Sequence, residues 1–395
     1  MSGLLTVSRN ELRRILGLKP VFSVMVGALA IYALLYPQPY RAEALRRTPV
    51  AVVDQDQTVT SRDLVRRLDA SPDAAVASVR PDFPAARRSV FAREVSGILV
   101  VPEGFERELL RGNPSPVALY ADASYFLVYQ RLALGVSTIA HTVGAEVEVR
   151  RLIGLGVDAP VATAAANPMP LTTIPLFNPQ EGYASYVLPA AFVLILQQTL
   201  LIGVGLLGTL PGADAVRRTA EGTIVAGPFA TVAGKLLAYL ALEVVLVPLY
   251  LVVLPFFYGI PRLGGLLPTL LFAAPFVLAT GALGLIIAAA FRTPLAVQLV
   301  MAALGLPFFF LSGFSWPFEA MPQVARWLAL PVPSTSAIEG FVALGQLGAG
   351  LSDVRANIVT LLTLASSYTA LAVWLESRST RASSKAPGDG GMLPR

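Results

Sequence analysis

The chain has 395 residues, of which 55% are hydrophobic and 14% are charged, and its formal net charge is +5. Soluble domains carry about 25% charged residues, so this composition excludes an ordinary soluble domain and predicts an integral membrane protein. The absence of cysteine and the presence of one histidine, His141, exclude disulfides, cysteine nucleophiles and multi-histidine metal sites.

The sequence contains no recognisable nucleotide-binding or catalytic motif. The stretch "GPFATVAGKL" is nearest to a phosphate-binding loop, but its spacing is wrong and Leu236 stands where a Ser or Thr would hold magnesium. The basic residues are not interleaved with aromatic residues, as they are in nucleic-acid-binding surfaces. We therefore expect no cofactor, no metal, no nucleic-acid partner and no enzymatic activity.

The long apolar runs predict transmembrane helices. A bilayer core of about 30 Å requires about 20 apolar residues in helical form. The runs that meet this length predict six helices, at 19–37, 183–208, 236–258, 265–290, 294–313 and 356–375. The predicted fold class is therefore an α-helical integral membrane protein, with residues 1–18 preceding the first helix and residues 376–395 forming a disordered tail.

The basic residues predict the orientation of these helices. With six spans the basic clusters all fall on one side, which the positive-inside rule assigns to the cytoplasm. The clusters are Arg9, Arg13, Arg14 and Lys19; Arg217, Arg218 and Lys235; Arg292; and Arg378, Arg381 and Lys385. We therefore predict a multi-pass protein of the bacterial inner membrane with both termini in the cytoplasm. In the alternative, residues 1–44 are a cleaved signal peptide, although their apolar centre exceeds the usual length of about 7–15 residues.

Residues 38–182 are expected to form an extracytoplasmic α/β domain. The strand-like segments "TPVAVVDQD", "AAVASV", "GILVV" and "SPVALYADAS" alternate with helical patterns, the first of which has Ser61 as its expected N-cap. A long helix is predicted from Tyr125 to about Leu155. The candidate chemical residues of this domain are Asp54, Asp56, Asp122 and His141. We expect them to have structural roles, because Asp is common in the turns that follow strands.

The loop at 209–235, between the second and third helices, contains "VRRTAEGTIVAGPFATVAGK". Its charge pattern alone fits an ordinary cytoplasmic loop in which Lys235 anchors a helix end at the headgroups. Its motif resembles the corresponding region of type 2 ABC exporter permeases. The matching residues are Glu221, Gly222, Thr223, Pro228, Gly234 and Lys235, and Arg217 and Arg218 stand where that family has another charged pair. The resemblance implies a coupling helix that docks on an ATPase subunit.

Three further segments carry the same resemblance. The N-terminal "SRNELRRILGLKP" is similar to the amphipathic elbow helix that precedes the first span in that family. The segments "VAVVDQD" and "GILVVPEGFERELLRG" resemble the branch with a long extracytoplasmic insert. The stretch "SGFSWPFEAMP" resembles the outer segment between the fifth and sixth helices. The resemblance therefore covers nearly the whole chain.

The prolines of residues 314–352 predict short helices that dip into the outer leaflet, because proline both begins and ends helices. The resemblance implies that this segment is an outer lid over an export path. Its expected gate residues are Gly313, Trp316, Pro317, Glu319, Met321 and Pro322. In the alternative, the segment is an interfacial loop whose prolines are only structural.

Glu243 is the only acidic residue deep in a predicted span. Intramembrane carboxylates are costly and are candidate functional residues by default. A structural pair or a side chain that snorkels to the interface remains an alternative. The other candidate path residues are Phe192, Gln197, Gln198, Phe308, Phe309 and Phe310, which favour an amphipathic or lipid-like cargo.

The resemblance implies the permease subunit of an ATP-driven exporter of drugs, lipid-like molecules or other amphipathic cargo. The expected partners are a separate ABC ATPase subunit, a second permease copy or a paralogue, membrane lipids, and, in an envelope-spanning exporter, a periplasmic adaptor protein. The glycines at 203, 205, 208, 281 and 284 are expected to permit close helix packing. Two other functions are weighed: a membrane-anchored receptor or scaffold that uses its extracytoplasmic domain, and a membrane enzyme such as a lipid-modifying transferase.

Overall fold

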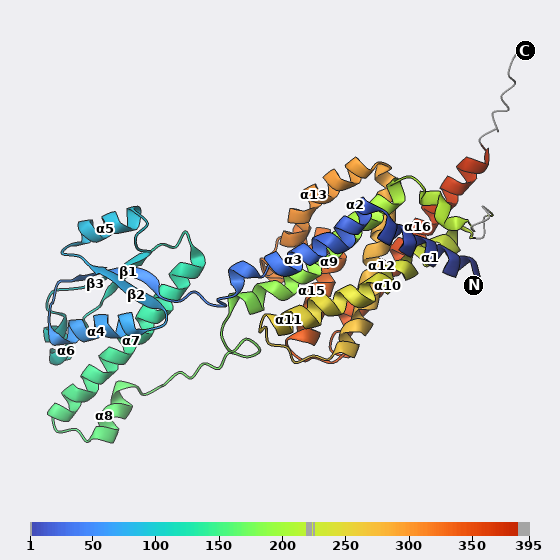
Figure 1. Ribbon diagram of the computed structural model, residues 1–395. Helices are drawn as coiled ribbons and strands as arrows, with labels where there is room; N and C mark the ends of the chain where they lie inside the picture. The colour runs from blue at the N-terminus through green and yellow to red at the C-terminus, as the bar shows by residue number, and fades with distance from the viewer. Residues whose placement is uncertain (1, 219–222, 224–225, 386–395) are drawn as a thin grey trace, which may run out of the picture. The chain divides into compact units, whose positions relative to one another are not determined.

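The computed structural model describes residues 2–218, 223 and 226–385. The chain divides into two compact units (Figure 1). Unit 1 comprises Met1–Glu43 and Pro175–Arg395, and unit 2 comprises Ala44–Ile174. The units are described separately below.

Unit 1 is built from helices. In chain order these are α1 (Ser2–Gly17), α2 (Lys19–Phe22), η1 (Ser23–Ala28), α3 (Leu29–Leu35), η2 (Gln38–Tyr40), α9 (Tyr183–Thr209), η3 (Ala213–Arg217), α10 (Pro228–Pro248), η4 (Leu249–Val253), α11 (Leu254–Phe257), α12 (Leu266–Phe291), α13 (Pro294–Leu311), η5 (Phe318–Ala320), α14 (Gln323–Ala329), α15 (Pro333–Gly345) and α16 (Arg355–Lys385). The first span joins α2, η1, α3 and η2, and the third joins α10, η4 and α11.

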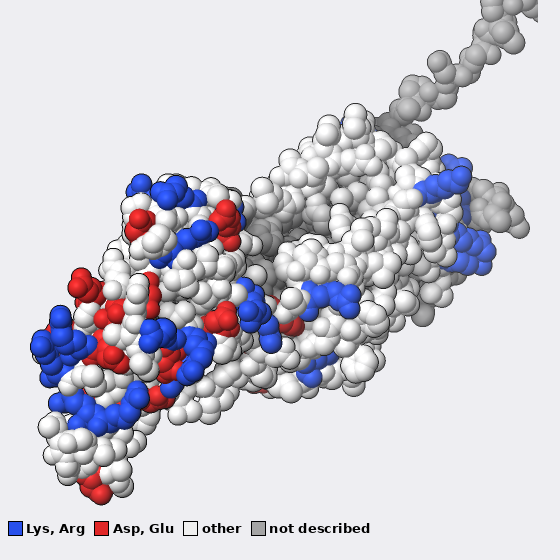
Figure 2. Space-filling model, turned by 60° about the vertical axis from the view of Figure 1, so that its left-hand side comes forward, with Lys and Arg blue, Asp and Glu red and all other residues white. Residues whose placement is uncertain are grey.

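Six helical segments of the described chain are long and apolar enough to cross a membrane. They are Lys19–Tyr40, Tyr183–Thr209, Pro228–Phe257, Leu266–Phe291, Pro294–Leu311 and Arg355–Thr380. A seventh would be added if the bent pair of α14 and α15 were counted as one span. Figure 2 shows that the viewed face of unit 1 has a broad surface without charged side chains, with Lys and Arg at the right-hand end and in smaller patches towards the left. The prediction of a helical membrane protein is confirmed.

Two helices are longer than the sequence predicted. Helix α10 begins at Pro228, because proline suits the first helical position and Gly227 supplies an extended N-cap. Helix α16 continues to Lys385, so the prediction of a disordered tail from residue 376 is wrong for residues 376–385. Glu376 there pairs with Arg217, which ties the extension to the rest of unit 1. Residues 386–395 lie outside the described part of the chain.

Helix α9 is at the centre of unit 1 and packs against the first span, α12, α13 and α15. Glycines make this packing close. A Cβ atom at Gly203 would lie 2.2 Å from Met25 Cγ, and one at Gly208 would lie 2.5 Å from Ala288 Cβ. These two positions therefore exclude any larger side chain unless the neighbouring helix shifts, as expected for small residues at membrane-helix interfaces.

Unit 2 contains a four-stranded sheet with strand order β2-β1-β3-β4. The strands are β1 (Thr48–Asp54), β2 (Ala74–Val79), β3 (Gly97–Val101) and β4 (Ala118–Ala121), and the helices are α4 (Val59–Ala70), α5 (Phe83–Phe91), α6 (Phe105–Arg111), α7 (Phe126–Gly154) and α8 (Ala159–Ala166). Strand β1 pairs in parallel with β2 and β3, and β4 pairs antiparallel with β3. The last helix, α8, follows the long helix that the sequence predicted from Tyr125 to about Leu155.

Both faces of this sheet are buried. Val50 and Val52 of β1 pack on one face with Leu132 of α7. Ala51 and Val53 of the same strand pack on the other face in a separate cluster, which includes Ala86 of α5. Successive side chains of a strand point to opposite faces, so the continuous apolar run of β1 is the pattern expected of a central parallel strand.

The start of α4 corrects one prediction. Ser61 is not the N-cap; Thr58 is, and Ser61 occupies the third helical position. The Thr58 side chain accepts a hydrogen bond from the Ser61 backbone N–H, and the Ser61 hydroxyl accepts one from the Thr58 N–H. The Ser61 hydroxyl also donates to Asp54 at 2.8 Å. A reciprocal capping box of this kind satisfies two otherwise unpaired N–H groups, which favours the earlier start.

The ion pair between α4 and α7 predicts an acid dependence of unit 2. Arg67 donates to both carboxylate oxygens of Glu146, at 2.8 and 2.7 Å, and this hydrogen bonding lowers the pKa of Glu146 below its ordinary value of 4.5. A carboxyl whose pKa is lowered by folding contributes stability above its unfolded pKa and loses it as the pH falls through the folded pKa. We expect Glu146→Gln to flatten the loss of stability below about pH 4.5.

This prediction can be checked by hydrogen-exchange protection of β1 and β3 in the full-length protein between pH 7 and pH 3. Glu103→Gln is the control, because Glu103 is exposed and makes no ion pair among the described residues. An equal acid dependence in wild type and Glu146→Gln would contradict the assigned role of the pair.

Candidate functional site

The N-terminal helix α1 packs along the beginning of α10. A Cβ atom at Gly234 would lie 2.7 Å from the Leu4 carbonyl oxygen and 2.7 Å from Val7 Cβ. Val7 is fully buried and forms a small cluster with Val216 and Ala226. Gly234, which the motif singled out, therefore provides the space in which α1 rests on α10.

Polar contacts also hold α1 in place. The Tyr239 hydroxyl of α10 donates to Glu11 at 2.8 Å, and Glu11 is fully buried. Arg14 pairs with Glu11 at 3.2 Å and donates to the Leu207 carbonyl of α9 at 2.9 Å. One buried network thus joins α1 to both the second and the third spans. Its place in the core of unit 1 favours retention of residues 1–44 over their removal as a signal peptide.

The connection between α9 and α10 is bound on two sides. The Asn10 side-chain amide of α1 donates to the Val216 and Arg218 carbonyls at 3.2 and 3.1 Å. Arg217 pairs with Glu376 of α16 at 3.5 Å and donates to the Thr380 hydroxyl at 3.2 Å. The segment η3 is therefore tied to the first and last helices of unit 1.

The predicted coupling residues fall into three groups. Pro228 begins α10, and Lys235 is buried one turn beyond Thr231, with 7% of its surface exposed. Arg218 and Thr223 are exposed. Glu221 and Gly222, the centre of the motif, lie outside the described residues. The structure therefore brings together the flanks of the motif and leaves its centre undescribed.

Helix α1 and the end of α16 lie at the same end of unit 1 (Figure 1). A cavity of about 910 Å³ opens there between the ends of α9, α10, α12 and α16. The charged residues that line it are Asp214, Lys235, Arg292, Glu376 and Arg378. The basic clusters that the sequence assigned to one side of the membrane are therefore neighbours in space.

Helices α14 and α15 form a hairpin that enters unit 1 and returns. Near its start, the Phe314 carbonyl accepts a hydrogen bond from the Tyr186 hydroxyl of α9 at 2.7 Å. Just past its end, Gln346 donates to the neighbouring Ser185 carbonyl. Between them, the Ser334 N–H donates to the buried Gln197 side chain at 2.7 Å.

These contacts measure how deeply the hairpin enters. Gln197 lies about 18 Å further along α9 than Ser185, at about 1.5 Å of rise per residue. The two helices meet at 85°, on either side of a break that contains Pro331. The bend therefore contacts the middle of α9, whereas Phe314 and Gln346, which flank the hairpin, contact the start of α9.

The predicted gate residues cluster where α13 gives way to this hairpin. Gly313 adopts a left-handed conformation, with φ of +78°, that a residue with a side chain rarely adopts. Trp316 is 59% exposed and Glu319 is also exposed, whereas Met321 is buried. Pro317 and Pro322 flank the short η5 turn. The structure thus supplies one polar and one aromatic side chain at the surface of the segment.

Glu243 lies on α10 with 3% of its surface exposed. Its Oε2 atom is buried and has no hydrogen-bond partner among the described residues. A snorkelling carboxylate would reach water, so the structure does not favour that alternative. The side chain instead sits two turns beyond Lys235, on the same face of α10 as Tyr239.

The buried carboxyl of Glu243 leads to a stability prediction. Burying an unpartnered polar group costs about 1–3 kcal/mol in proteins. We therefore expect Glu243→Leu to raise the thermal unfolding temperature of the purified protein. Gln198→Leu is the opposing control, because Gln198 donates to the Met301 carbonyl at 2.6 Å and its loss should lower that temperature. A lower unfolding temperature for Glu243→Leu would show that its carboxylate has a stabilising partner in the assembly.

The remaining candidate path residues differ in exposure. Phe192 and Gln197 are fully buried, and Phe192 packs edge-to-face against Tyr250 with ring centroids 5.4 Å apart. Phe310 is 54% exposed on α13. The other exposed apolar residues of α13 include Leu295, Leu299 and Leu306. Phe192 is therefore a core residue of this chain, whereas α13 presents an apolar surface.

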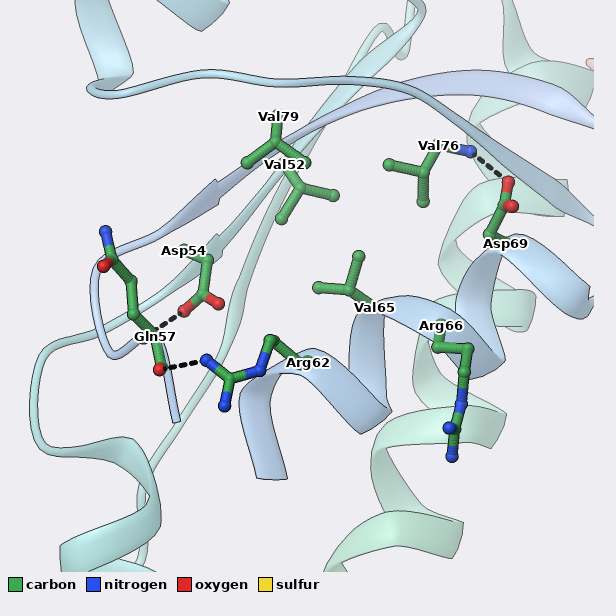
Figure 3. A pocket seen from close by; sticks show the side chains of 9 residues that line it. All are labelled: Val52, Asp54, Gln57, Arg62, Val65, Arg66, Asp69, Val76 and Val79. Atoms are coloured by element: carbon green, nitrogen blue, oxygen red, sulfur yellow. Dashed lines mark hydrogen bonds between the residues drawn. The ribbon is translucent and has the colours of Figure 1, made fainter. Parts of the chain in front are cut away.

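A pocket of about 570 Å³ in unit 2 lies between α4 and strands β1 and β2 (Figure 3). Val52, Val65 and Val76 face this hollow. The acids at its edge have structural partners: Asp54 accepts from the Gln57 N–H at 2.9 Å, and Asp69 accepts from the Val76 N–H at 2.9 Å (Figure 3).

Two other candidate chemical residues of unit 2, both acids, also have structural partners, whereas His141 is exposed on α7. Asp56 accepts from the Thr58 hydroxyl and the Glu106 N–H. Asp122 accepts from Ser124, and this hydrogen bonding lowers its pKa. Among the described residues, no group of His, Cys, Asp and Glu could hold a metal ion.

Sequence reasoning missed several residues of these sites. Asn10, Glu11 and Glu376 anchor the α9–α10 connection and the elbow, and Ser334 meets Gln197 at the hairpin bend. No local pattern marks the first three, because each acts through a partner far away in the chain. Ser334 follows Pro333, which marks the helix start in the sequence, but nothing in the sequence shows that the Ser334 N–H meets Gln197.

Comparison with known proteins places these features in a family. A family model described as ABC-2 family transporter protein matches residues 19–374. The chain is 23% identical over 376 residues to the inner membrane transport permease YhhJ of Escherichia coli K12, covering 92% of this chain and 94% of that protein. It is also 23% identical over 367 residues to the probable multidrug ABC transporter permease YbhS of the same organism, covering 91% of each chain.

Proposed function

The chain belongs to the ABC-2 family of transporter proteins and is a transmembrane permease subunit, and we propose that it works in an exporter driven by a separate ABC ATPase. The observation that carries this proposal is the anchoring of the α9–α10 connection. Asn10 binds that connection to α1, and Arg217 binds it to Glu376 of α16. A push on the connection would therefore move several helices together.

In this mechanism the ATPase binds at the end of unit 1 that carries the basic clusters, which we place in the cytoplasm by the positive-inside rule. The contact residues are Glu221, Gly222 and Thr223, flanked by Arg217, Arg218, Pro228, Gly234 and Lys235. ATP-driven closure of the ATPase would rotate the linked helices as a rigid body. With both termini in the cytoplasm, unit 2 follows the first span on the outer side.

The outer end of the path is closed by the α14–α15 hairpin and the segment before it. The exposed Glu319 and Trp316 line the mouth, while Gly313, Pro317, Met321 and Pro322 fix the shape of the turn. The exposed apolar face of α13 is the surface on which a second permease copy or a paralogue docks. An apolar path between two such subunits suits drugs, lipid-like molecules and other amphipathic cargo.

The proposal is tested by co-expression with an ABC ATPase encoded beside this chain. We expect the two subunits to co-purify and to extrude a lipophilic dye from energised cells, but not from cells depleted of ATP. Glu221→Ala and Gly222→Pro should reduce ATPase stimulation, whereas Arg355→Ala, on the helix end remote from the loop, should not. ATP-dependent extrusion that is unchanged in both loop variants would refute the coupling role.

A further inference from the structure

The cavity at the basic end of unit 1 contains a cation that has no counter-ion among the described residues. Lys235 lines this cavity, is 7% exposed as a residue, and makes no hydrogen bond or ion pair in the described part of the chain. Its stem is buried, while its ammonium is not among the fully buried atoms that lack a partner, so the charge faces the open cavity. A cation in such a semi-enclosed place attracts an anion, which the described chain does not supply.

The acids of the cavity do not fill that role. Glu376 is already engaged by Arg217 at 3.5 Å. Asp214 is exposed on η3, with no ion pair among the residues that the structure describes. Two more cations, Arg292 and Arg378, line the same cavity. The cavity therefore has three cations and two carboxylates. One carboxylate is already paired and the other is exposed to solvent, so the net charge of the lining is positive.

Each cation is placed by a different element. Arg292 ends α12 in a left-handed conformation, with φ of +54°, which turns the chain sharply into α13. Arg378 lies over the Trp374 ring of α16, with its guanidinium carbon 4.3 Å from the ring centroid. Lys235 projects from the first turns of α10. Cations from three helices thus converge on one opening.

One part of the remaining wall is apolar, and Thr209 and Ser379 add hydroxyl groups to another part. Val232 of α10, Leu285 and Ala288 of α12, and Ala372 and Leu375 of α16 line the cavity beside the cations. The volume of about 910 Å³ is far more than a small inorganic anion needs. A ligand that satisfies both surfaces has an anionic head and an apolar body.

We propose that this cavity binds an anionic membrane phospholipid, with its phosphate at Lys235 and an acyl chain against the α12 and α16 wall. Arg292 and Arg378 attract the headgroup at the rim, as basic pockets between membrane helices do. The site is formed within one chain, so it does not depend on the direction of transport or on the identity of the cargo.

The experiment is native mass spectrometry of the detergent-purified full chain titrated with phosphatidylglycerol. Phosphatidylcholine and inorganic phosphate are titrated in parallel. We expect phosphatidylglycerol to bind and Lys235→Gln to weaken its binding by about tenfold or more, the loss expected for one charge-assisted hydrogen bond. Arg13→Gln is the matched control, because it removes an exposed cation of α1 that does not line the cavity.

Each outcome bears on the proposal. Equal phosphatidylglycerol affinity in wild type and Lys235→Gln would overturn it, as would equal weakening by Arg13→Gln, which indicates non-specific attraction. Binding of inorganic phosphate as tight as that of the lipid would overturn the assignment to a lipid. If Lys235→Gln does not fold, the double variant Arg292→Gln, Arg378→Gln replaces it, since both residues are exposed and their loss should weaken binding as well.

Discussion

The Gly340→Ala variant is expected to lose transport, because helix α15 can no longer rest against α12. A Cβ atom at Gly340 would lie 2.0 Å from Phe272 Cζ. Phe272 is fully buried and packs edge-to-face against Phe341, with ring centroids 4.8 Å apart, so its ring has no free space to enter. Overpacking of a well-packed core costs about 1–3 kcal/mol. The re-entrant hairpin should therefore be displaced or destabilised.

The measurement combines thermal unfolding with ATP-dependent dye extrusion. Gly305→Ala is the matched control, because a Cβ atom there would lie 3.5 Å from Gln198 Nε2, an ordinary contact, on membrane helix α13. Gly305→Ala should unfold and transport like wild type. If Gly340→Ala transported normally, the position of the hairpin against α12 would have no part in gating.

The spans could be predicted because a bilayer demands long apolar helices, and these are visible as runs of uncharged residues. The residues at which these helices begin and end could not be predicted in the same way. Lys235 was expected to mark the beginning of the third span at the headgroups, but it is buried, and the helix begins at Pro228. Lys235 lies beside a cavity that α12 and α16 complete, and no local pattern shows which distant helices will surround a residue.

The strands of unit 2 could also be read from the sequence, since β1 and β3 are short apolar runs that end in turn residues. The N-cap of α4 was misplaced by three residues. Both Thr58 and Ser61 are good capping residues, and the choice between them is made by Asp54, which accepts the Ser61 hydroxyl. Helix-capping preferences describe single residues and include no contact with a distant residue, so they do not distinguish Thr58 from Ser61.

The candidate sites could be predicted only in part, because a motif is visible in the sequence whereas its distant partners in the fold are not. The residue order predicts a coupling motif and the prolines predict a re-entrant segment, and both stay predictions. The partners that fix them are remote: Asn10 and Glu376 hold the α9–α10 connection from opposite ends of the chain. Single polar residues in helices carry no signal of this kind, because most of them are solvated.

The pair of Arg217 and Glu376 is expected to be the main mechanical link between the coupling loop and α16. Their side chains are 12% and 22% exposed, so the pair is partly shielded from water. Removing one partner of a shielded pair leaves the other charge uncompensated. Arg217→Met alone should therefore reduce coupled ATPase activity and stability more than the double variant Arg217→Met, Glu376→Met does.

A double-mutant cycle measures this link. We expect a coupling energy of about 0.5–3 kcal/mol between Arg217 and Glu376, the range found for residues in direct contact. The control cycle uses Arg80 and Glu94 of unit 2, a 3.3 Å pair whose side chains are 37% and 58% exposed and which should couple by about 0–1 kcal/mol. Additive effects at Arg217 and Glu376 would mean that α16 does not receive the push through this pair. The contacts of the connection with α1, through Asn10 and Val216, would then have to carry it.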